Sequence, residues 1–530
     1  MKLLGPAAAF LLAALMLLWG LDRPYLWQDE AATAVLAERM LRFGRPLAYD
    51  GVNLITTDNF AAEDQTTIGQ RTTNARAAVD YYVRKGDVKP DTTWKWQPWG
   101  SLVVCAASLA LLGKTTLAAR LPFALAGILT VVLLYNLVLD YSKRRLTAFV
   151  AAVLLTFNCY WILHTRQCRY YALSSLFLVL TLSAYLRWQQ GRSWGAALFV
   201  AAAFAWFQCD YGTVWPVLLV LFADAFAQRR NRMHTAIVGV VTGLVIAPFA
   251  YYYEILGRHG AQEMTWPQIW QFNLFNMNDY VAPVVVPIAA VGLLLRRWKR
   301  LPELERRLVG TACGMIVALA FWIPSVAPDP FLRYVIIAAP VGCLLGAWVL
   351  VQISGRYAEL AFCGALVWII TPWFSLPLHP LLSLPPWYKE GSVVRPELPM
   401  LMSEVFGRAE DPNGGMIEWL RKNTAPTDEI LINYEDIPLM FYLPNPIRGG
   451  IAAFRAEDDS KMPPSVAILR RSVGFYHAGV FQREIGRYRW KQAPVEIPDR
   501  TWGNNPDPMA TNQPAAASYI IVLQRDQAAK

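Results

Sequence analysis

The sequence predicts a polytopic α-helical membrane protein with a polar α/β domain at its C-terminal end. Of its 530 residues, 55% are hydrophobic, 21 are Trp, and the mean hydropathy is +0.29, which is too apolar for a soluble enzyme. Apolar runs long enough to cross a bilayer recur up to residue 376, and from about Pro385 the composition becomes polar. These observations together define the fold class.

Eleven apolar runs are each long enough to cross the hydrocarbon core when helix tilt is allowed. The first run follows Met1-Lys2 and lacks a small-x-small cleavage site, so we interpret it as a retained helix. A shorter run, 99–112, has the length of an interfacial or re-entrant element. The eleven runs are 3–21, 121–141, 146–163, 171–187, 194–209, 212–227, 235–253, 281–295, 308–325, 334–352 and 358–376.

Loop charges predict the orientation of these runs. Alternate loops carry clusters of Lys and Arg, such as Lys143-Arg144-Arg145 and Arg296-Arg297, which the positive-inside rule assigns to the cytoplasm. The N-terminus is then cytoplasmic, and residues 22–120 form a long first external loop with a candidate interfacial helix over 31–43. Topology and anionic lipid headgroups explain the net charge of +10, so we exclude nucleic acid as a partner.

Two domains follow from the change in composition: a transmembrane module over 1–384 and an external α/β domain over 385–530. The second has a helix-like stretch from Gly415 to Asn423 and strand-like runs from Glu429 to Tyr434 and from Ser518 to Leu523. All seven Cys lie in or at the ends of apolar segments, so no disulfide framework or zinc cluster is predicted.

Asp29 and Glu30 lie just after the first apolar run, at the mouth of a membrane helix. Acidic residues at such a position are costly and usually functional. A carboxylate there can deprotonate a hydroxyl of one substrate while a lipid-linked second substrate lies in the bilayer beside it. We predict Asp29 as the general base, with Glu30 orienting Asp29 or the acceptor.

Cationic side chains on the same predicted face indicate an anionic partner, because external loops are normally poor in Lys and Arg. Arg binds phosphate through two parallel hydrogen bonds, and Lys offers a point charge. A polyprenyl-phosphate sugar needs such groups at headgroup depth, where they stabilise the charge of the leaving phosphate. The predicted phosphate-binding residues are Lys95, Arg166, Arg169, Tyr170, Arg333 and Tyr334, and the predicted acceptor- or sugar-binding residues are Gln97, Asp210 and Tyr211.

Each of these features also has a simpler explanation. The acidic pair can be an interfacial helix cap, and each Arg can reach lipid headgroups without binding substrate. Lys95, between Trp94 and Trp96, can be an aromatic-belt anchor, and Asp210-Tyr211 can be a polar turn between spans. Their joint placement on one face by an independent charge argument favours the functional interpretation.

With these residues placed, nearly the whole chain resembles the GT-C superfamily of membrane glycosyltransferases, in the branch of protein O-mannosyltransferases and the lipid A aminoarabinose transferase. The motifs are Asp29-Glu30, Ala118-Ala119-Arg120-Leu121-Pro122, Arg166-x-x-Arg169-Tyr170-Tyr171, and Arg333-Tyr334 followed by Pro340. The resemblance implies a GT-C type A-like fold and an inverting polyprenyl-phosphate-sugar transferase with Asp29 as base. Gln97 stands where relatives usually carry His or Lys, and the loop from about Tyr49 to Pro90 is longer and more polar than usual.

The function expected from these features is transfer of a monosaccharide to a lipid or glycan of a bacterial cell envelope, on the external face of the inner (plasma) membrane. Protein O-mannosylation is the nearest alternative, with a protein as acceptor. A transporter of lipid-linked saccharides is a further alternative, although spans nearly free of internal charge disfavour it. Any divalent cation would need oxygen ligands such as Asp29 and Glu30.

Overall fold

The computed structural model places the described residues in two compact units. The first unit comprises Met1–Gly20, Pro98–Ser101 and Leu121–Phe406, and the second comprises Leu21–Gln97, Leu102–Arg120 and Gly407–Lys530. The described residues are 4–55, 83, 88–228, 232–255, 265–326, 332–379, 394–395, 397–407, 410–448, 463–470, 485–486, 488–499 and 519–526. Most of the long polar loop predicted over 49–90, and also Ser518, lie outside these residues.

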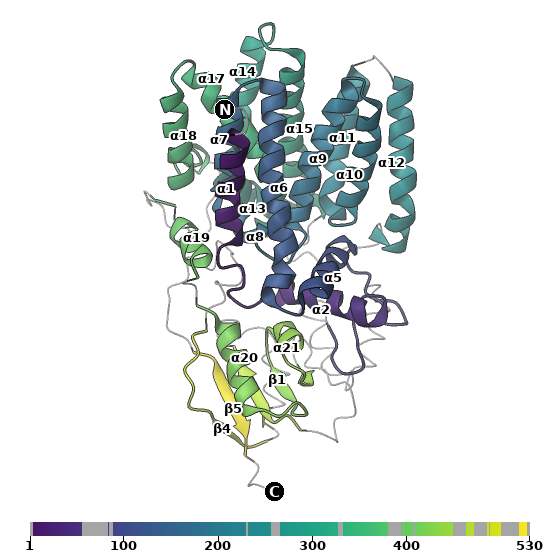
Figure 1. Cartoon of the computed structure of the whole chain (residues 1–530), viewed down its shortest axis with the longest axis vertical. Coiled ribbons are helices and arrows are strands. Elements are labelled where there is room, and N and C mark those ends of the chain that lie inside the picture. Colours follow the sequence, from purple (N-terminus) through teal and green to yellow (C-terminus); the bar gives the residue numbers. More distant parts are fainter. Residues whose placement is uncertain are drawn as a thin grey trace. The chain divides into compact units, whose positions relative to one another are not determined.

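The first unit is a bundle of apolar helices (Figure 1). By length and composition, five helices can each cross a membrane, and two bent helix pairs raise this number to seven within the described residues. The five are α6 (Thr116–Ser142), α9 (Tyr171–Gln189), α12 (Arg232–Tyr252), α15 (Glu303–Val326) and the continuous segment Leu332–Ser354, which contains α16 (Leu332–Val335), η3 (Ile336–Ala338) and α17 (Ala339–Ser354).

Two predicted spans are broken, which the sequence analysis did not anticipate. α7 (Arg145–Thr156) and α8 (Cys159–Thr165) meet at 67°, and the segment Trp266–Val281, which contains α13 (Trp266–Asn276) and η2 (Met277–Val281), meets α14 (Val285–Arg297) at 77°. At the first break, the side chain of Asn158 accepts a hydrogen bond from the Trp161 amide and so caps α8.

Four shorter apolar helices account for the other predicted runs. They are α1 (Leu4–Leu18), α10 (Ser193–Phe207), α11 (Tyr211–Ala227) and α18 (Ala358–Ile370). Every apolar run that the sequence analysis treated as a span therefore coincides with a helix, a helix pair or the segment Leu332–Ser354. The prediction of a polytopic helical membrane protein is confirmed, whereas the orientation of the helices stays a prediction.

A buried polar cluster joins three helices of the first unit. Arg307 of α15 donates to Asp224 of α11 at 2.6 Å and to the Tyr185 hydroxyl of α9 at 2.9 Å, and that hydroxyl donates to Asp224. Because each of these groups meets a partner, their mutual attraction offsets part of the cost of removing them from water.

The N-terminal part of the second unit contains α2 (Gln28–Phe43) and most of α5 (Gly100–Leu112). The helix predicted over 31–43 is confirmed, but its apolar face is only partly exposed: Leu36 is fully buried, whereas Leu41 and Phe43 are exposed. Arg39 is also buried, and its guanidinium donates to the carbonyl oxygens of the following turn and to Asp50. α2 is therefore packed inside the protein along much of its length.

The C-terminal part of the second unit is a five-stranded sheet with flanking helices, as the sequence predicted. The strand order is β2-β1-β3-β5-β4, in which β1 pairs parallel with β2 and β3, and β5 pairs antiparallel with β3 and β4. The elements are α20 (Pro412–Asn423), β1 (Ile430–Ile432), α21 (Asp436–Tyr442), β2 (Ile447–Arg448), β3 (Val466–Leu469), β4 (Trp490–Gln492) and β5 (Ile521–Arg525). The proposed boundary at residue 385 stays a prediction.

Candidate functional site

Asp29 and Glu30 occupy the first turn of α2 but have different surroundings. Negative charge is favoured there by the helix dipole. Asp29 is half-buried, whereas Glu30 is fully buried and both of its carboxylate oxygens accept hydrogen bonds from Arg120, at 2.8 and 2.6 Å. This geometry suits Glu30 to an orienting role and gives it poor access to a substrate.

Arg120 also fixes the chain that leads into α2. Its Nη1 donates to the carbonyl oxygens of Pro24 at 2.7 Å and Leu21 at 3.3 Å. A single guanidinium thus ties both ends of the segment 21–30 together. The sequence analysis quoted Arg120 only as part of a motif and did not predict this role.

Lys95 and Gln97 belong to the second unit, as Asp29 does. Lys95 is buried, with 7% of its surface exposed, next to Trp94, which pairs in an isolated antiparallel bridge with Val88. Gln97 is half-buried and ends this part of the unit. Their predicted contacts with phosphate and acceptor stay predictions.

Arg166 has a structural role that the sequence did not indicate. It is buried, and its guanidinium donates to the carbonyl oxygens of Met16 at 2.9 Å, Leu17 at 3.3 Å and Gly20 at 3.1 Å. Met16 and Leu17 lie in the last turn of α1, where carbonyl groups lack partners within the helix and a cation is favoured, and Gly20 lies just beyond it. Arg166 therefore anchors the end of the helix that precedes Asp29, and its contact with a donor phosphate stays a prediction.

Four of the other predicted residues lie close together in the first unit. Burial raises the pKa of the Tyr170 hydroxyl well above its usual value, and Asp210 and Tyr334 raise it further, whereas Arg169 lowers it. The Arg169 guanidinium also lies over the Tyr170 ring, 5.6 Å from its centroid. Residues that are distant in the sequence thus interact in one polar cluster, whereas their predicted roles in binding stay predictions.

Asp210 caps a helix within this cluster. One of its carboxylate oxygens accepts from the Gly212 amide at 2.9 Å, and the other accepts from the Thr213 hydroxyl. Burial raises its pKa above the usual value for Asp. Tyr211 follows as the first residue of α11 and is half-buried. The capping geometry agrees with the simpler explanation of Asp210 as part of a turn, and binding of a sugar by either residue stays a prediction.

Arg333 lies in α16 and is half-buried. Its guanidinium is 5.6 Å from the centroid of the Tyr334 ring. Arg333 also interacts electrostatically with His164 at the end of α8. Phe331, which the sequence analysis quoted with these residues, lies outside the described part of the chain. Of the predicted cations, Arg169 and Arg333 thus lie in the neighbourhood of Tyr170 and Tyr334.

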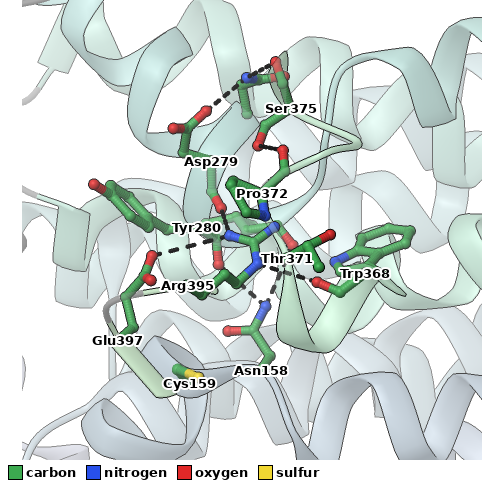
Figure 2. Close-up of polar contacts among 12 residues, drawn as sticks. Asn158, Cys159, Asp279, Tyr280, Trp368, Thr371, Pro372, Ser375, Arg395 and Glu397 are labelled. Atoms are coloured by element: carbon green, nitrogen blue, oxygen red, sulfur yellow. Dashed lines mark hydrogen bonds and ion pairs between the residues drawn. The ribbon is translucent and has the colours of Figure 1, made fainter. Parts of the chain in front are cut away.

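A second polar cluster, which the sequence analysis missed, surrounds the π-helical turn η2 (Figure 2). The Asp279 carboxylate lies 2.9 Å from His379 Nε2 and accepts from Asn278 at 2.7 Å. Arg395 donates to the carbonyl oxygens of Asp279 and Trp368, the latter at 3.0 Å. Asp279 belongs to η2, and Trp368 lies in the last turn of α18, where carbonyl groups lack partners within the helix. The sequence analysis used no signal that pointed to this cluster.

A small cavity lies beside this cluster, lined by Asn158, Asp279, Arg395 and Glu397 among others. Its free space of about 20 Å³ exceeds the roughly 10–15 Å³ that one water molecule requires. Glu397 is buried 3.9 Å from Arg395, and burial raises the pKa of its carboxyl group. The cavity can therefore hold a small polar group such as water.

The sequence analysis named Asp29 and Glu30 as the oxygen ligands that a divalent cation would need. Within the described ranges, no group of three or more His, Cys, Asp or Glu side chains lies close enough to hold a metal ion. Both oxygens of Glu30 already accept from Arg120, so this carboxylate does not fit the role of cation ligand that the sequence suggested.

Part of the chain matches a known family, and the whole fold is similar to that of a solved protein. Residues 97–252 match the family model described as dolichyl-phosphate-mannose-protein mannosyltransferase. The fold is similar to that of ArnT from Cupriavidus metallidurans bound to undecaprenyl phosphate, with a TM-score of 0.58 and 13% identity over 98% of this chain and 97% of that chain. The apo state of the same protein gives a TM-score of 0.56 at the same identity and coverage. No curated protein sequence matches the chain.

Proposed function

We propose that this chain is an inverting membrane glycosyltransferase of the GT-C type. Its fold and the family match of residues 97–252 support the proposal. The donor is a polyprenyl-phosphate monosaccharide, and the acceptor is a lipid or glycan of the cell envelope. Loop charges favour chemistry on the external face of the membrane. The observation that carries the proposal is the half-buried Asp29 in the first turn of α2, on a segment fixed by Arg120.

The proposed reaction is a single displacement. The oxygen of the acceptor hydroxyl attacks the anomeric carbon, and Asp29 takes the proton of this hydroxyl. The bond between this carbon and the phosphate oxygen breaks, and the polyprenyl phosphate leaves with the electron pair. The phosphate is already a good leaving group, so a second, proton-donating carboxyl group is unnecessary, and the configuration inverts.

Cationic side chains provide the second requirement of this reaction, because negative charge grows on the leaving phosphate. We propose that Arg169 and Arg333 bind the donor phosphate, with Tyr170 and Tyr334 as further contacts. These residues lie in the first unit and interact with one another. Lys95 and Arg166 are retained as weaker candidates because both are buried. ArnT bound to undecaprenyl phosphate supports a lipid phosphate as the ligand.

A protein acceptor is the second candidate, favoured by the description of the family matched by residues 97–252. The two candidates share donor, base and mechanism, and differ in the product. Labelled product that partitions into organic solvent indicates a lipid acceptor. Labelled product that precipitates with protein and is released by protease indicates a protein acceptor.

The test is transfer of radiolabelled sugar from a panel of polyprenyl-phosphate monosaccharides to an envelope extract by purified protein. We expect activity with one donor, and a loss of about 1,000-fold or more in Asp29→Asn, because the change is isosteric and removes only the basic oxygen. Asp22→Asn is the matched control, since Asp22 is an exposed acid on the same loop. Turnover that is insensitive to Asp29, or absent with every donor, would argue for a different base or for transport of lipid-linked saccharides.

A further inference from the structure

The extended segment that leads into α2 is bound by the C-terminal part of the second unit through its backbone. The Tyr25 amide donates to Asp411 at 2.8 Å, and the Leu26 amide donates to the Tyr442 hydroxyl at 3.1 Å. The Leu26 carbonyl oxygen accepts from Asn413 at 3.1 Å. The polar backbone groups of this segment are thus satisfied by side chains almost 400 residues away in the sequence.

Gln28 makes the contact nearest to Asp29. Its Nε2 donates to the Asp436 carboxylate at 2.8 Å, and its Oε1 accepts from the Ile437 amide at 3.3 Å. Gln28 and Asp436 are each at most 1% exposed, so water does not compete for these bonds. The amide group of Gln28 therefore bridges the first turn of α2 to the first turn of α21.

The partners of this segment lie at a particular edge of the sheet. β1 and β3 are parallel neighbours, and Asp436 follows the carboxyl end of β1 while Arg470 follows that of β3. Arg470 donates to Asn413 at 3.1 Å, and Asn413 in turn donates to Leu26. In open α/β sheets, this edge is where ligands bind. Here the chain's own segment 25–28 is bound beside it.

We propose that Gln28 and Asp436 are positioning residues, through which the C-terminal domain holds Asp29 in the geometry that transfer requires. The inference rests on the proposed function, because Asp29 is the group being positioned. On this proposal, the C-terminal part of the second unit positions the catalytic base. The edge at the carboxyl ends of β1 and β3 then holds segment 25–28 and does not bind the acceptor. A misplacement of about 1 Å at a reacting group can cost about 100-fold in rate.

The test changes the length of each side chain by one methylene group in the full-length protein. Gln28→Asn shortens one of the two hydrogen-bonded side chains by a methylene group, and Asp436→Glu lengthens the other by the same amount. The double variant therefore restores the combined length and volume of the two side chains. We expect each single variant to lower kcat about 10- to 100-fold with little change in KM for the donor, and the double variant to recover most of the loss. Gln492→Asn, on the exposed strand β4, is the matched control.

Hydrogen exchange measured by mass spectrometry gives a second readout that is independent of the donor. We expect the Tyr25 and Leu26 amides to exchange faster in Gln28→Asn, and to return to the wild-type rate in the double variant. Unchanged kcat and exchange in a folded Gln28→Asn, while Asp29→Asn is inactive, would overturn this inference alone. Losses that multiply in the double variant would also overturn it. Full activity of Asp29→Asn would overturn both this inference and the proposed base.

Discussion

Glu30 and Arg120 form a buried, two-pronged ion pair in which Nε and Nη2 of the arginine donate to the two carboxylate oxygens. Only 4% of the Arg120 side chain and none of the Glu30 side chain is exposed. Such pairs add little net stability over well-packed apolar residues, but removing one partner leaves a buried charge. The pair therefore enforces the shape of the segment before α2 more than it stabilises the protein.

Arg120→Met is predicted to destabilise the protein by about 3–5 kcal/mol, because Glu30 becomes a buried charge without its partner. The thermal unfolding midpoint in detergent measures this effect. Arg120→Met with Glu30→Leu is expected to recover much of the loss, since no charge is then buried. Arg421→Met is the control: it removes an ion pair with Glu418 that is 41% and 49% exposed, worth about 0–1 kcal/mol. Equal midpoints for Arg120→Met and Arg421→Met would contradict the prediction.

Arg333 and Arg166 are predicted to respond differently to replacement by Ala. Arg333→Ala is expected to lower kcat/KM for the donor about 10- to 100-fold, the cost of losing a charge-assisted hydrogen bond to phosphate. Arg166→Ala is expected to lower the unfolding midpoint instead, because carbonyl groups at the end of α1 lose their donor. Binding of undecaprenyl phosphate and thermal unfolding, measured for both variants, separate the two effects. Weaker lipid binding only in Arg166→Ala would reverse our assignment.

The positions of the helices could be predicted from the sequence because each one contains a continuous apolar run. The breaks at Asn158 and at η2 could not be predicted, because they are accompanied by a hydrogen bond between segments that are far apart in the sequence. The Asn158 amide donates to the carbonyl oxygen of Tyr280, a contact between residues more than 100 positions apart. Periodicity reports local burial and carries no information about such partners.

In the candidate site too, some residues could be predicted from the sequence and others could not. The acidic pair, Tyr170 and Arg333 were visible because charged and aromatic groups stand out beside apolar runs. Arg166 was visible for the same reason, yet its partners at the end of α1 are backbone carbonyl groups, which leave no trace in a sequence. Gln28 and Asp436 were not predicted, because an amide and a carboxylate in polar segments are ordinary residues until the fold brings them together.

Arg395→Lys is predicted to destabilise the cluster around η2 by about 1–3 kcal/mol. Lys cannot replace the guanidinium fork that donates to the Asp279 and Trp368 carbonyl oxygens, and an unsatisfied buried carbonyl carries this cost. Hydrogen exchange over residues 277–281, together with the unfolding midpoint, would detect the change. The same substitution at the exposed Arg356 is expected to have no effect. Normal protection of η2 in Arg395→Lys would show that the cluster does not hold this turn.

The Asp436 carboxyl group gives the protein a predicted pH dependence. Burial, followed by smaller effects that include the charge of Glu435, raises its pKa from 3.8 to about 6. Between these values the folded protein holds a proton that the unfolded chain has released, so stability falls as pH rises through this window. Above it, the difference between the two pKa values corresponds to about 3 kcal/mol of destabilisation.

Asp436→Asn tests this dependence, because the amide resembles the protonated carboxyl group and can still accept the hydrogen bond from Gln28. We expect the unfolding midpoint of the variant, relative to wild type, to rise between pH 4 and pH 7.5. The gain arises because the variant never buries the charge that wild type carries at the higher pH. The same substitution at the exposed Asp22 controls for the general effect of removing a carboxylate. If the midpoints of Asp436→Asn and wild type change in parallel over this range, Asp436 does not titrate in the folded protein as predicted.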